Sequence, residues 1–76
     1  MDISMRVCAI IADVLEINVS ELSGSSSPAS VEKWDSIAHI NIVSAMEIEF
    51  GFKFLLSDLE NIRTVSDFSR FVKANT

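Results

Sequence analysis

Apolar side chains near the start of the sequence recur at the spacing of one α-helical face, and no other feature limits the fold as strongly. The residues that show this spacing are Ile3, Val7, Ile10, Ile11 and Val14. Such spacing is typical of an amphipathic helix, whereas a half-buried strand alternates apolar and polar residues. Asp2 or Ser4 can cap this helix, which we expect to end near Glu16. Because no alternating pattern, internal repeat or heptad run occurs elsewhere in the sequence, we predict an all-α fold.

Residues that favour helix ends predict three further helices. Asp35 is a favourable N-cap for a second helix that reaches about Phe50, and Gly51 can stop it. A capping-box spacing occurs in Ser57-Asp58-Leu59-Glu60 and predicts a short third helix. A looser version occurs in Thr64-Val65-Ser66-Asp67, where Asp replaces the usual Glu or Gln, and it predicts the last helix.

A long serine-rich segment, residues 17–33, separates the first two predicted helices. It exceeds the usual length of a connection, so we expect it to be packed, functional or both, with Trp34 anchoring its end. The predicted architecture is an all-α four-helix bundle with a short third helix and a long loop between helices 1 and 2. The 76 residues make one small domain, so we expect 1–76 to be a single domain. Since a deep catalytic cleft is hard to form in so small a core, we expect the chain to carry or bind something rather than to transform it.

The charge and cysteine content of the chain limit its partners and its setting. Eleven acidic residues against six basic ones give a net charge of −5. Nucleic-acid phosphates demand lysine and arginine, so this balance disfavours nucleic acid and favours basic protein partners. Cys8 stands alone in an apolar run, where we expect a buried, unreactive thiol. The lone cysteine, the lack of a signal-peptide pattern and the lack of a membrane-spanning run lead us to expect a cytoplasmic protein.

The second predicted helix has two apolar faces, although packing in a bundle requires only one. At about 100° per residue, one face forms the predicted core stripe, which consists of His39, Val43, Met46 and Phe50. Ile42 flanks this stripe. A different sector holds Ile37, Ile40 and Ile48. Exposed apolar patches tend to be contact sites, and the acidic residues around this one suit a transient interface. The alternative is that the short third helix or the long loop covers these isoleucines.

Four roles compete for Ser36, at the start of the second predicted helix. It can be a passive helix-start residue, a catalytic nucleophile, a phosphorylation site or the attachment point of a larger group through a phosphodiester. Catalysis is disfavoured, since His39 is the only histidine, is predicted to face the core, and no Gly-x-Ser-x-Gly elbow is present. A phosphate on the serine would meet the free N–H groups and the positive dipole end of the helix. We therefore predict no enzyme activity and assign no catalytic residue and no metal ligand.

A resemblance to a known family rests on the motif Asp35-Ser36-Ile37, followed by a helix that ends in Glu47-Ile48-Glu49-Phe50-Gly51. This arrangement resembles the acyl carrier protein family, in which the matching motif, Asp-Ser-Leu, is the attachment site of 4'-phosphopantetheine. The resemblance covers nearly the whole chain, because the predicted elements occur in the family's order.

The resemblance implies that a separate, magnesium-dependent phosphopantetheinyl transferase attaches 4'-phosphopantetheine from coenzyme A to Ser36. The terminal thiol would then hold an acyl or aminoacyl group as a thioester. Asp35 would cap the helix and help the transferase recognise the serine.

The resemblance also implies where partner enzymes and cargo would bind. The partner-binding candidates are Ile37, Ile40, Asn41, Glu47 and Ile48. Asn41 and Ile48 occupy positions that are often acidic in carriers of fatty acid synthesis. Trp34 and His39 are similar to residues of carriers outside that pathway. The candidates for an acyl pocket, with its entrance near Glu60, are His39, Met46, Leu59 and Ile62.

Together these features predict a monomeric acyl carrier protein that serves acyl-loading and acyl-processing enzymes in a specialised lipid, polyketide or related biosynthetic pathway. The acidic bias favours an acyl carrier over an aminoacyl or peptidyl carrier of the same fold, which is the nearest alternative. An alternative of another class is a helical interaction module that never receives an arm, with Ser36 only a helix-start residue.

Overall fold

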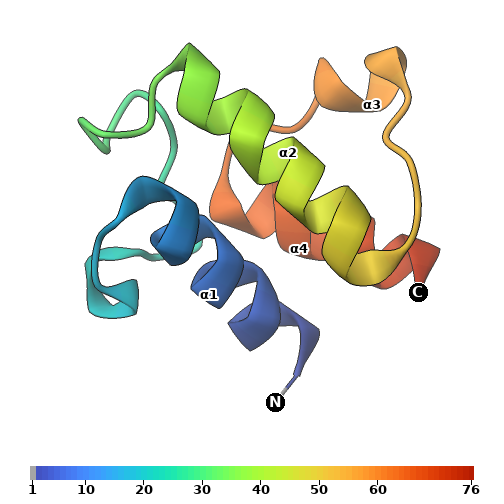
Figure 1. The fold of residues 1–76 in the computed structure, drawn as a ribbon, viewed down its shortest axis with the longest axis horizontal. Coiled ribbons are helices and arrows are strands. Elements are labelled where there is room, and N and C mark those ends of the chain that lie inside the picture. The colour runs from blue at the N-terminus through green and yellow to red at the C-terminus, as the bar shows by residue number, and fades with distance from the viewer. Residues whose placement is uncertain (1) are drawn as a thin grey trace.

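The computed structural model describes residues 2–76, which form helices joined by irregular segments (Figure 1). The elements are α1 (Ile3–Leu15), the 3-10 turn η1 (Val19–Glu21), α2 (Ser36–Phe50), α3 (Leu56–Leu59) and α4 (Val65–Asn75). No strand is present within residues 2–76, so the predicted all-α fold with a short third helix is confirmed. None of the helices in this part of the chain has the length and apolar content needed to cross a membrane.

Helix α1 begins at one of the two predicted caps and ends where predicted. The Asp2 carboxylate accepts a hydrogen bond from the backbone N–H of Met5 at 2.8 Å, so Asp2 rather than Ser4 caps the helix. At the other end Glu16 adopts a left-handed conformation, with φ of 56°. The next amide, that of Ile17, then bonds back to the carbonyl of Ala12 at 3.0 Å, which closes the last turn.

Helices α2 and α4 also begin at their predicted caps. The Asp35 carboxylate accepts from the N–H of Ala38 at 2.8 Å, and Gly51 ends α2 in a left-handed conformation with φ of 75°. Thr64 and Asp67 form a reciprocal capping box, in which the threonine hydroxyl accepts from the Asp67 N–H and the aspartate accepts from the Thr64 N–H. The shorter aspartate therefore serves at this position in place of the usual glutamate.

Helix α3 does not begin at Ser57, so the predicted capping box was wrong in its register. The helix starts at Leu56, and the carboxylate of Asp58 accepts from the N–H of Leu55 at 3.0 Å. Phe54 is buried and its amide donates to Glu47, which fixes the chain two residues before the helix. Asp58 consequently caps the helix from inside its first turn.

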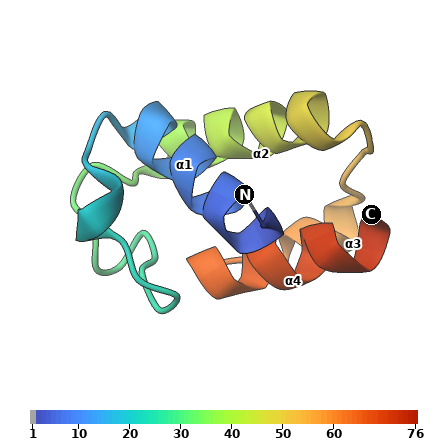
Figure 2. The same cartoon turned by 90° about the horizontal axis from the view of Figure 1, so that it is seen from below.

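Helices α1, α2 and α4 enclose the core, with α1 lying between the other two and contacting both (Figure 2). The largest fully buried side chains are Trp34, Phe68, Ile11, Ile42, Met46, Val7 and Val72. They come from the three long helices and from the end of the long connection. The core therefore depends little on the short helix α3.

The buried stripe of α2 differs in its centre from the predicted one. Ile42 and Met46 are fully buried, whereas His39, Val43 and Phe50 are only partly buried. Ile42, which is predicted to flank the stripe, lies at its centre. The reason is that α3, with four residues, is too short to cover the His39 side of α2.

Cys8 is partly rather than fully buried and packs against the core. Burial, and in second place the charge of Asp2, raises the pKa of its thiol. The thiol therefore stays protonated at neutral pH and is a poor nucleophile, as expected.

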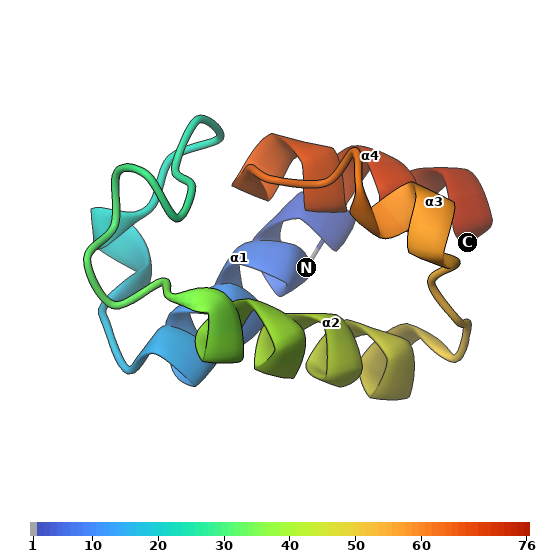
Figure 3. The same cartoon turned by 90° about the horizontal axis from the view of Figure 1, so that it is seen from above.

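The long connection is attached to the bundle at two places. Its middle meets the start of α4, where the amides of Val65 and Ser66 donate to the carbonyls of Ser26 and Gly24 at 3.1 and 2.9 Å (Figure 3). Its end is held by Trp34, which is 1% exposed and supports the prediction that it anchors the loop. The connection is thus fixed at its middle and at its end, although most of its residues are exposed, and it delivers the chain to the first turn of α2 in a fixed position.

Trp34 is held by an aromatic cluster and one hydrogen bond. Its ring stacks on His39 and on Phe68, with centroids 6.0 and 6.4 Å away. The indole N–H donates to Nδ1 of His39 at 3.0 Å. This bond requires that Nδ1 carry no proton, so it is made by the neutral imidazole and lost when the ring is protonated.

We predict that stability falls on mild acidification because of His39. Burial, and in second place the charge of Arg63, lowers the pKa of His39 below its usual value. The ring of His39 in the unfolded chain titrates at about pH 6.5. The stability that His39 contributes to the fold is therefore complete above that pH, and it is lost as the pH falls towards the lower pKa of the folded ring. His39→Asn keeps an acceptor near Nδ1 and cannot titrate, so urea unfolding of this variant should show a flatter pH dependence between about pH 5 and 7.

Acidic groups provide the internal control for that measurement. A hydrogen bond from the backbone amide of Arg63 lowers the pKa of Asp67. The stability that Asp67 contributes to the fold is therefore present above the unfolded aspartate pKa of about 4 and is lost only below it. Both proteins should therefore lose stability in that lower range. Equal slopes for wild type and His39→Asn between about pH 5 and 7 would contradict the role given to His39.

Candidate functional site

Ser36 is the first residue of α2 and is exposed. On one side the chain is fixed by buried Trp34, and on the other α2 is capped by Asp35. The Asp35 carboxylate accepts from the N–H of Ala38, so it serves the helix rather than acting as a base for the serine. As in any α-helix, the first amides of α2 lack an intrahelical partner and favour an anion beside them. The hydroxyl of Ser36 is therefore presented to solvent at a rigid, anion-compatible helix start.

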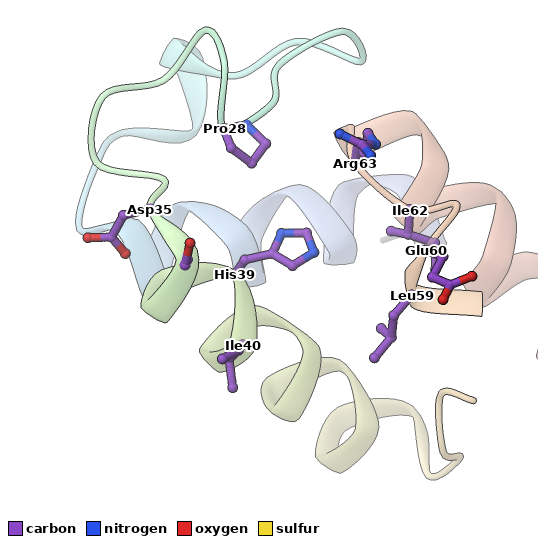
Figure 4. Close-up of a pocket in the computed structure, with 9 residues that line it drawn as sticks. Pro28, Asp35, His39, Ile40, Leu59, Glu60, Ile62 and Arg63 are labelled. Atoms are coloured by element: carbon purple, nitrogen blue, oxygen red, sulfur yellow. The ribbon is translucent and has the colours of Figure 1, made fainter. Parts of the chain in front are cut away.

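A pocket of about 380 Å³ lies beside this serine, between α2, the long connection and the segment from α3 to α4 (Figure 4). It is lined by Pro28, Asp35, Ser36, His39, Ile40, Leu59, Glu60, Ile62 and Arg63. The wall thus combines apolar side chains with charged groups of both signs. A group attached to Ser36 would have this pocket immediately next to its root.

The structure brings three of the four candidate pocket residues together. His39, Leu59 and Ile62 line the pocket with Ser36, and Glu60 lies at the same place as expected. Met46 does not line it, because this side chain is completely buried in the core and points to the interior of the bundle. Its assignment to the pocket is therefore corrected to a core position.

Two pocket residues had no signal in the sequence. Pro28 lies in the long connection and Arg63 directly precedes the cap of α4, so neither belongs to a motif. Only the packing of the connection against α4 brings them to the same wall. The other lining residues were already candidates: Asp35 and Ser36 belong to the attachment motif, and Ile40 belongs to the predicted exposed sector of α2. The resemblance had implied His39, Leu59, Glu60 and Ile62 for the acyl pocket.

His39 is not placed to activate Ser36. Its Nδ1 already accepts the Trp34 indole N–H, which leaves the proton of the neutral ring on Nε2. A ring with its proton on Nε2 and its other nitrogen occupied has no free lone pair to act as a general base. Its position is that of a packed, hydrogen-bonded residue at the edge of the pocket.

The outer face of α2 is apolar and uncovered. Ile37, Ile40 and Ile48 are 71%, 65% and 84% exposed. Asn41 is exposed as well, and at about 100° per residue it shares their side of the helix. Neither α3 nor the long connection covers these isoleucines, so the alternative that they are buried is wrong. Ile40 also lines the pocket, so this α2 face (Ile37, Ile40, Asn41 and Ile48) continues to the neighbourhood of Ser36.

Glu47 occupies a different position from the other partner-binding candidates. Its Oε2 accepts from the N–H of Phe54 at 2.9 Å, its other oxygen lies 4.0 Å from Nζ of Lys53, and its side chain is only 20% exposed. The residue therefore holds the turn after α2, and its carboxylate is less available to a partner than the side chains of the other candidates.

The start of α3 adds apolar surface that the sequence did not reveal. Leu55 and Leu56 are 66% and 76% exposed. Their neighbours Phe52 and Phe54 pack inward, and the short run of apolar residues gave no period by which to separate the two pairs.

Comparison with known proteins agrees with this geometry. A family model described as a phosphopantetheine attachment site matches residues 6–72. Among solved structures, the solution NMR structure of the holo acyl carrier protein from Geobacter metallireducens superimposes with a TM-score of 0.86 at 24% sequence identity, covering 97% of this chain and 85% of that chain. The structural likeness shows the fold, and the family model spans the core, the exposed serine and the pocket. The chain therefore belongs to the family of phosphopantetheine-binding carrier proteins, which carry their cargo on this covalently attached cofactor and are not themselves enzymes.

Proposed function

We propose that Ser36 is the attachment point of the phosphopantetheine arm and that the chain presents an acyl thioester on this arm to partner enzymes. The observation on which this rests is the exposed serine hydroxyl at the capped start of α2, within the part of the chain that the family model matches. Family membership already disfavours an unmodified helical interaction module.

The residues around Ser36 suit a phosphodiester. The free amides of the first helical turn and the positive end of the helix dipole favour the phosphate charge. The carboxylate of Asp35 accepts a hydrogen bond from the Ala38 amide at 2.8 Å, which stabilises this first turn. When bound, phosphopantetheine supplies a terminal thiol that holds the acyl group as a thioester. The chain itself supplies a fixed root for the arm, a neighbouring pocket and a surface for partners.

The exposed α2 face provides the contact area for those partners. Ile37 and Ile40 lie within the first two turns of α2, close to Ser36, so an enzyme that docks on them has the root of the arm beside its own active site. A tether of this kind raises the local concentration of cargo at the partner, while a small interface lets the carrier leave again. The partners in this proposal are a phosphopantetheinyl transferase and acyl-loading and acyl-processing enzymes, with no nucleic acid.

The proposed pathway is specialised lipid, polyketide or related biosynthesis. Asn41 and Ile48 are exposed and uncharged at positions that are often acidic in carriers of fatty acid synthesis, so a basic enzyme surface of that pathway has less to bind here. The net charge of −5 favours an acyl carrier over the aminoacyl or peptidyl alternative. Loading trials with candidate adenylating and acyltransferase enzymes separate the two by the cargo that is accepted.

The remaining parts of the proposal concern organisation and setting. Residues 2–76 share one hydrophobic core, which supports a single carrier domain. A monomer is part of the same proposal. The lone Cys8 suits a reducing cytoplasm, since it offers no partner for a disulfide within the chain.

Intact mass is the first test of the attachment site. Incubation with a phosphopantetheinyl transferase and coenzyme A should add the mass of one phosphopantetheine to the wild type and none to Ser36→Ala. Ser44→Ala, which removes another exposed serine of α2, should still gain it. A gain that survives Ser36→Ala, or no gain in the wild type, would sink the proposed function.

The α2 face can be tested by placing charge on it. Ile40→Glu and Ile48→Glu should keep the helical circular dichroism, since both side chains are exposed, and should slow transfer of cargo to a partner by roughly tenfold, the effect of losing one moderate interface contact. Ile48 lies outside the pocket, so its variant separates docking from cargo binding. Val19→Glu, at an exposed apolar residue of η1, is the matched control. Unchanged transfer in both α2 variants would show that partners dock elsewhere.

A further inference from the structure

The pocket beside Ser36 contains a guanidinium group without an ion-pair partner. Arg63 has no carboxylate within 4.0 Å anywhere in residues 2–76, where the ion pairs are Arg6–Glu49, Lys53–Glu47 and Arg70–Asp67. Only the backbone amide of Arg63 is engaged, since it donates to Asp67 at 3.0 Å. In Figure 4 its side chain extends towards Pro28 at the edge of the pocket. Its charge also reaches across to His39, where it is one of the two causes of the lowered pKa.

A second hydrogen-bond donor stands on the opposite wall. Because Nδ1 of His39 accepts from Trp34, the proton of the neutral ring is on Nε2. Figure 4 shows this ring projecting from α2 towards the segment that contains Ile62 and Arg63. No hydrogen bond from Nε2 to another group is present within the described residues, and the ring is only partly buried. The pocket therefore has a donor on each side.

The rest of the wall is largely apolar, and its two carboxylates are not directed at these donors. Pro28, Ile40, Leu59 and Ile62 supply the apolar part. The Asp35 carboxylate is bound to the first turn of α2. In Figure 4 the carboxylate of Glu60 lies beyond Ile62 as seen from His39.

We propose, building on the attachment at Ser36, that this pocket selects an acyl group that ends in a carboxylate, which Arg63 binds while the Nε2–H of His39 donates a second hydrogen bond. Guanidinium groups match carboxylates through two parallel hydrogen bonds, and the methylene part of such a chain is stabilised by the apolar wall. A plain alkyl chain offers neither donor an acceptor. The ammonium group of an aminoacyl thioester would face the like charge of Arg63.

The phosphate of the arm is a weaker candidate for the same arginine. A phosphodiester at Ser36 lies at the start of α2, where the helix amides already favour it. Arg63 comes from the other side of the pocket, between α3 and α4, so it meets what lies further along the arm. Because the guanidinium is exposed, the contact is worth little in water, and the preference it creates is a few-fold one.

Titration of the cargo itself tests the assignment. A phosphopantetheinyl transferase can load the chain from adipoyl-coenzyme A labelled with ¹³C in its terminal carboxylate, and intact mass confirms the product. An adjacent guanidinium favours the charged carboxylate, so its acid dissociation constant should be about threefold to fivefold larger than in free adipoyl-pantetheine, as read by ¹³C NMR. Arg63→Gln should abolish the difference. Lys73→Gln, which removes an exposed base of α4 outside this pocket, should keep it.

The NMR signal of the Arg63 side chain distinguishes recognition of the cargo from a general effect of the arm. The Nε–H resonance of Arg63 should move on loading with the adipoyl group and stay in place with hexanoyl, the chain of the same length that ends in a methyl group. The carboxylate assignment is overturned if adipoyl titrates as it does on free pantetheine, if its shift survives Arg63→Gln, or if hexanoyl moves the arginine signal equally. A chain that gains no mass at all would overturn the attachment at Ser36, and the carboxylate assignment with it.

Discussion

The hydrogen bond from the indole of Trp34 to Nδ1 of His39, at 3.0 Å, joins the long connection to α2, and the packing of both rings adds α4. Trp34 ends the long connection, His39 lies in the second turn of α2, and both rings pack on Phe68 of α4. Because Trp34 is buried only two residues before Ser36, this cluster fixes where the functional helix begins. It also fixes the tautomer of His39, so the same bond that closes the core decides which ring nitrogen faces the pocket.

Acidic residues of this chain serve its backbone as much as its surface. Side-chain carboxylates accept backbone amide protons at Asp2, Glu21, Asp35, Glu47, Asp58 and Asp67. Each of these bonds satisfies an amide that a helix start or a turn leaves without a partner. The net charge of −5 still attracts basic partners at a distance, but the carboxylates most available for direct contact are those outside the caps. In this protein a count of acids in the sequence overstates the acidic binding surface.

The fold could be predicted from the sequence because its signals are local. Asp35 and Thr64 cap their helices within three residues of themselves, and the apolar period of α1 needs no knowledge of the other helices. The start of α3 was missed for a tertiary reason, since it depends on Phe54 being buried and bound by Glu47. A capping motif in the sequence contains no information about such a tertiary contact.

The part of the site on α2 could be predicted from local geometry. Ser36 and the exposed α2 face follow from helical geometry, whereas the pocket wall combines segments that are distant in sequence. Pro28 and Arg63 meet there because the long connection packs on the start of α4, and Met46 is absent because the centre of the α2 stripe lies on Ile42. Helical periodicity gives the side of a helix, but the neighbour on that side depends on the whole fold.

The pocket depends on the short helix α3 and the segment after it, whereas the core depends mainly on the three long helices. One wall of the pocket is formed by the end of this four-residue helix, at Leu59, and by the segment after it. The helix lies between two buried side chains, Phe54 before it and Ile62 after it. The three long helices form their core without it. Lengthening or reshaping this segment would change the width of the pocket while the packing of the other helices stays the same. The architecture therefore separates the part that must be conserved in order to fold from the part that is free to diverge with the cargo.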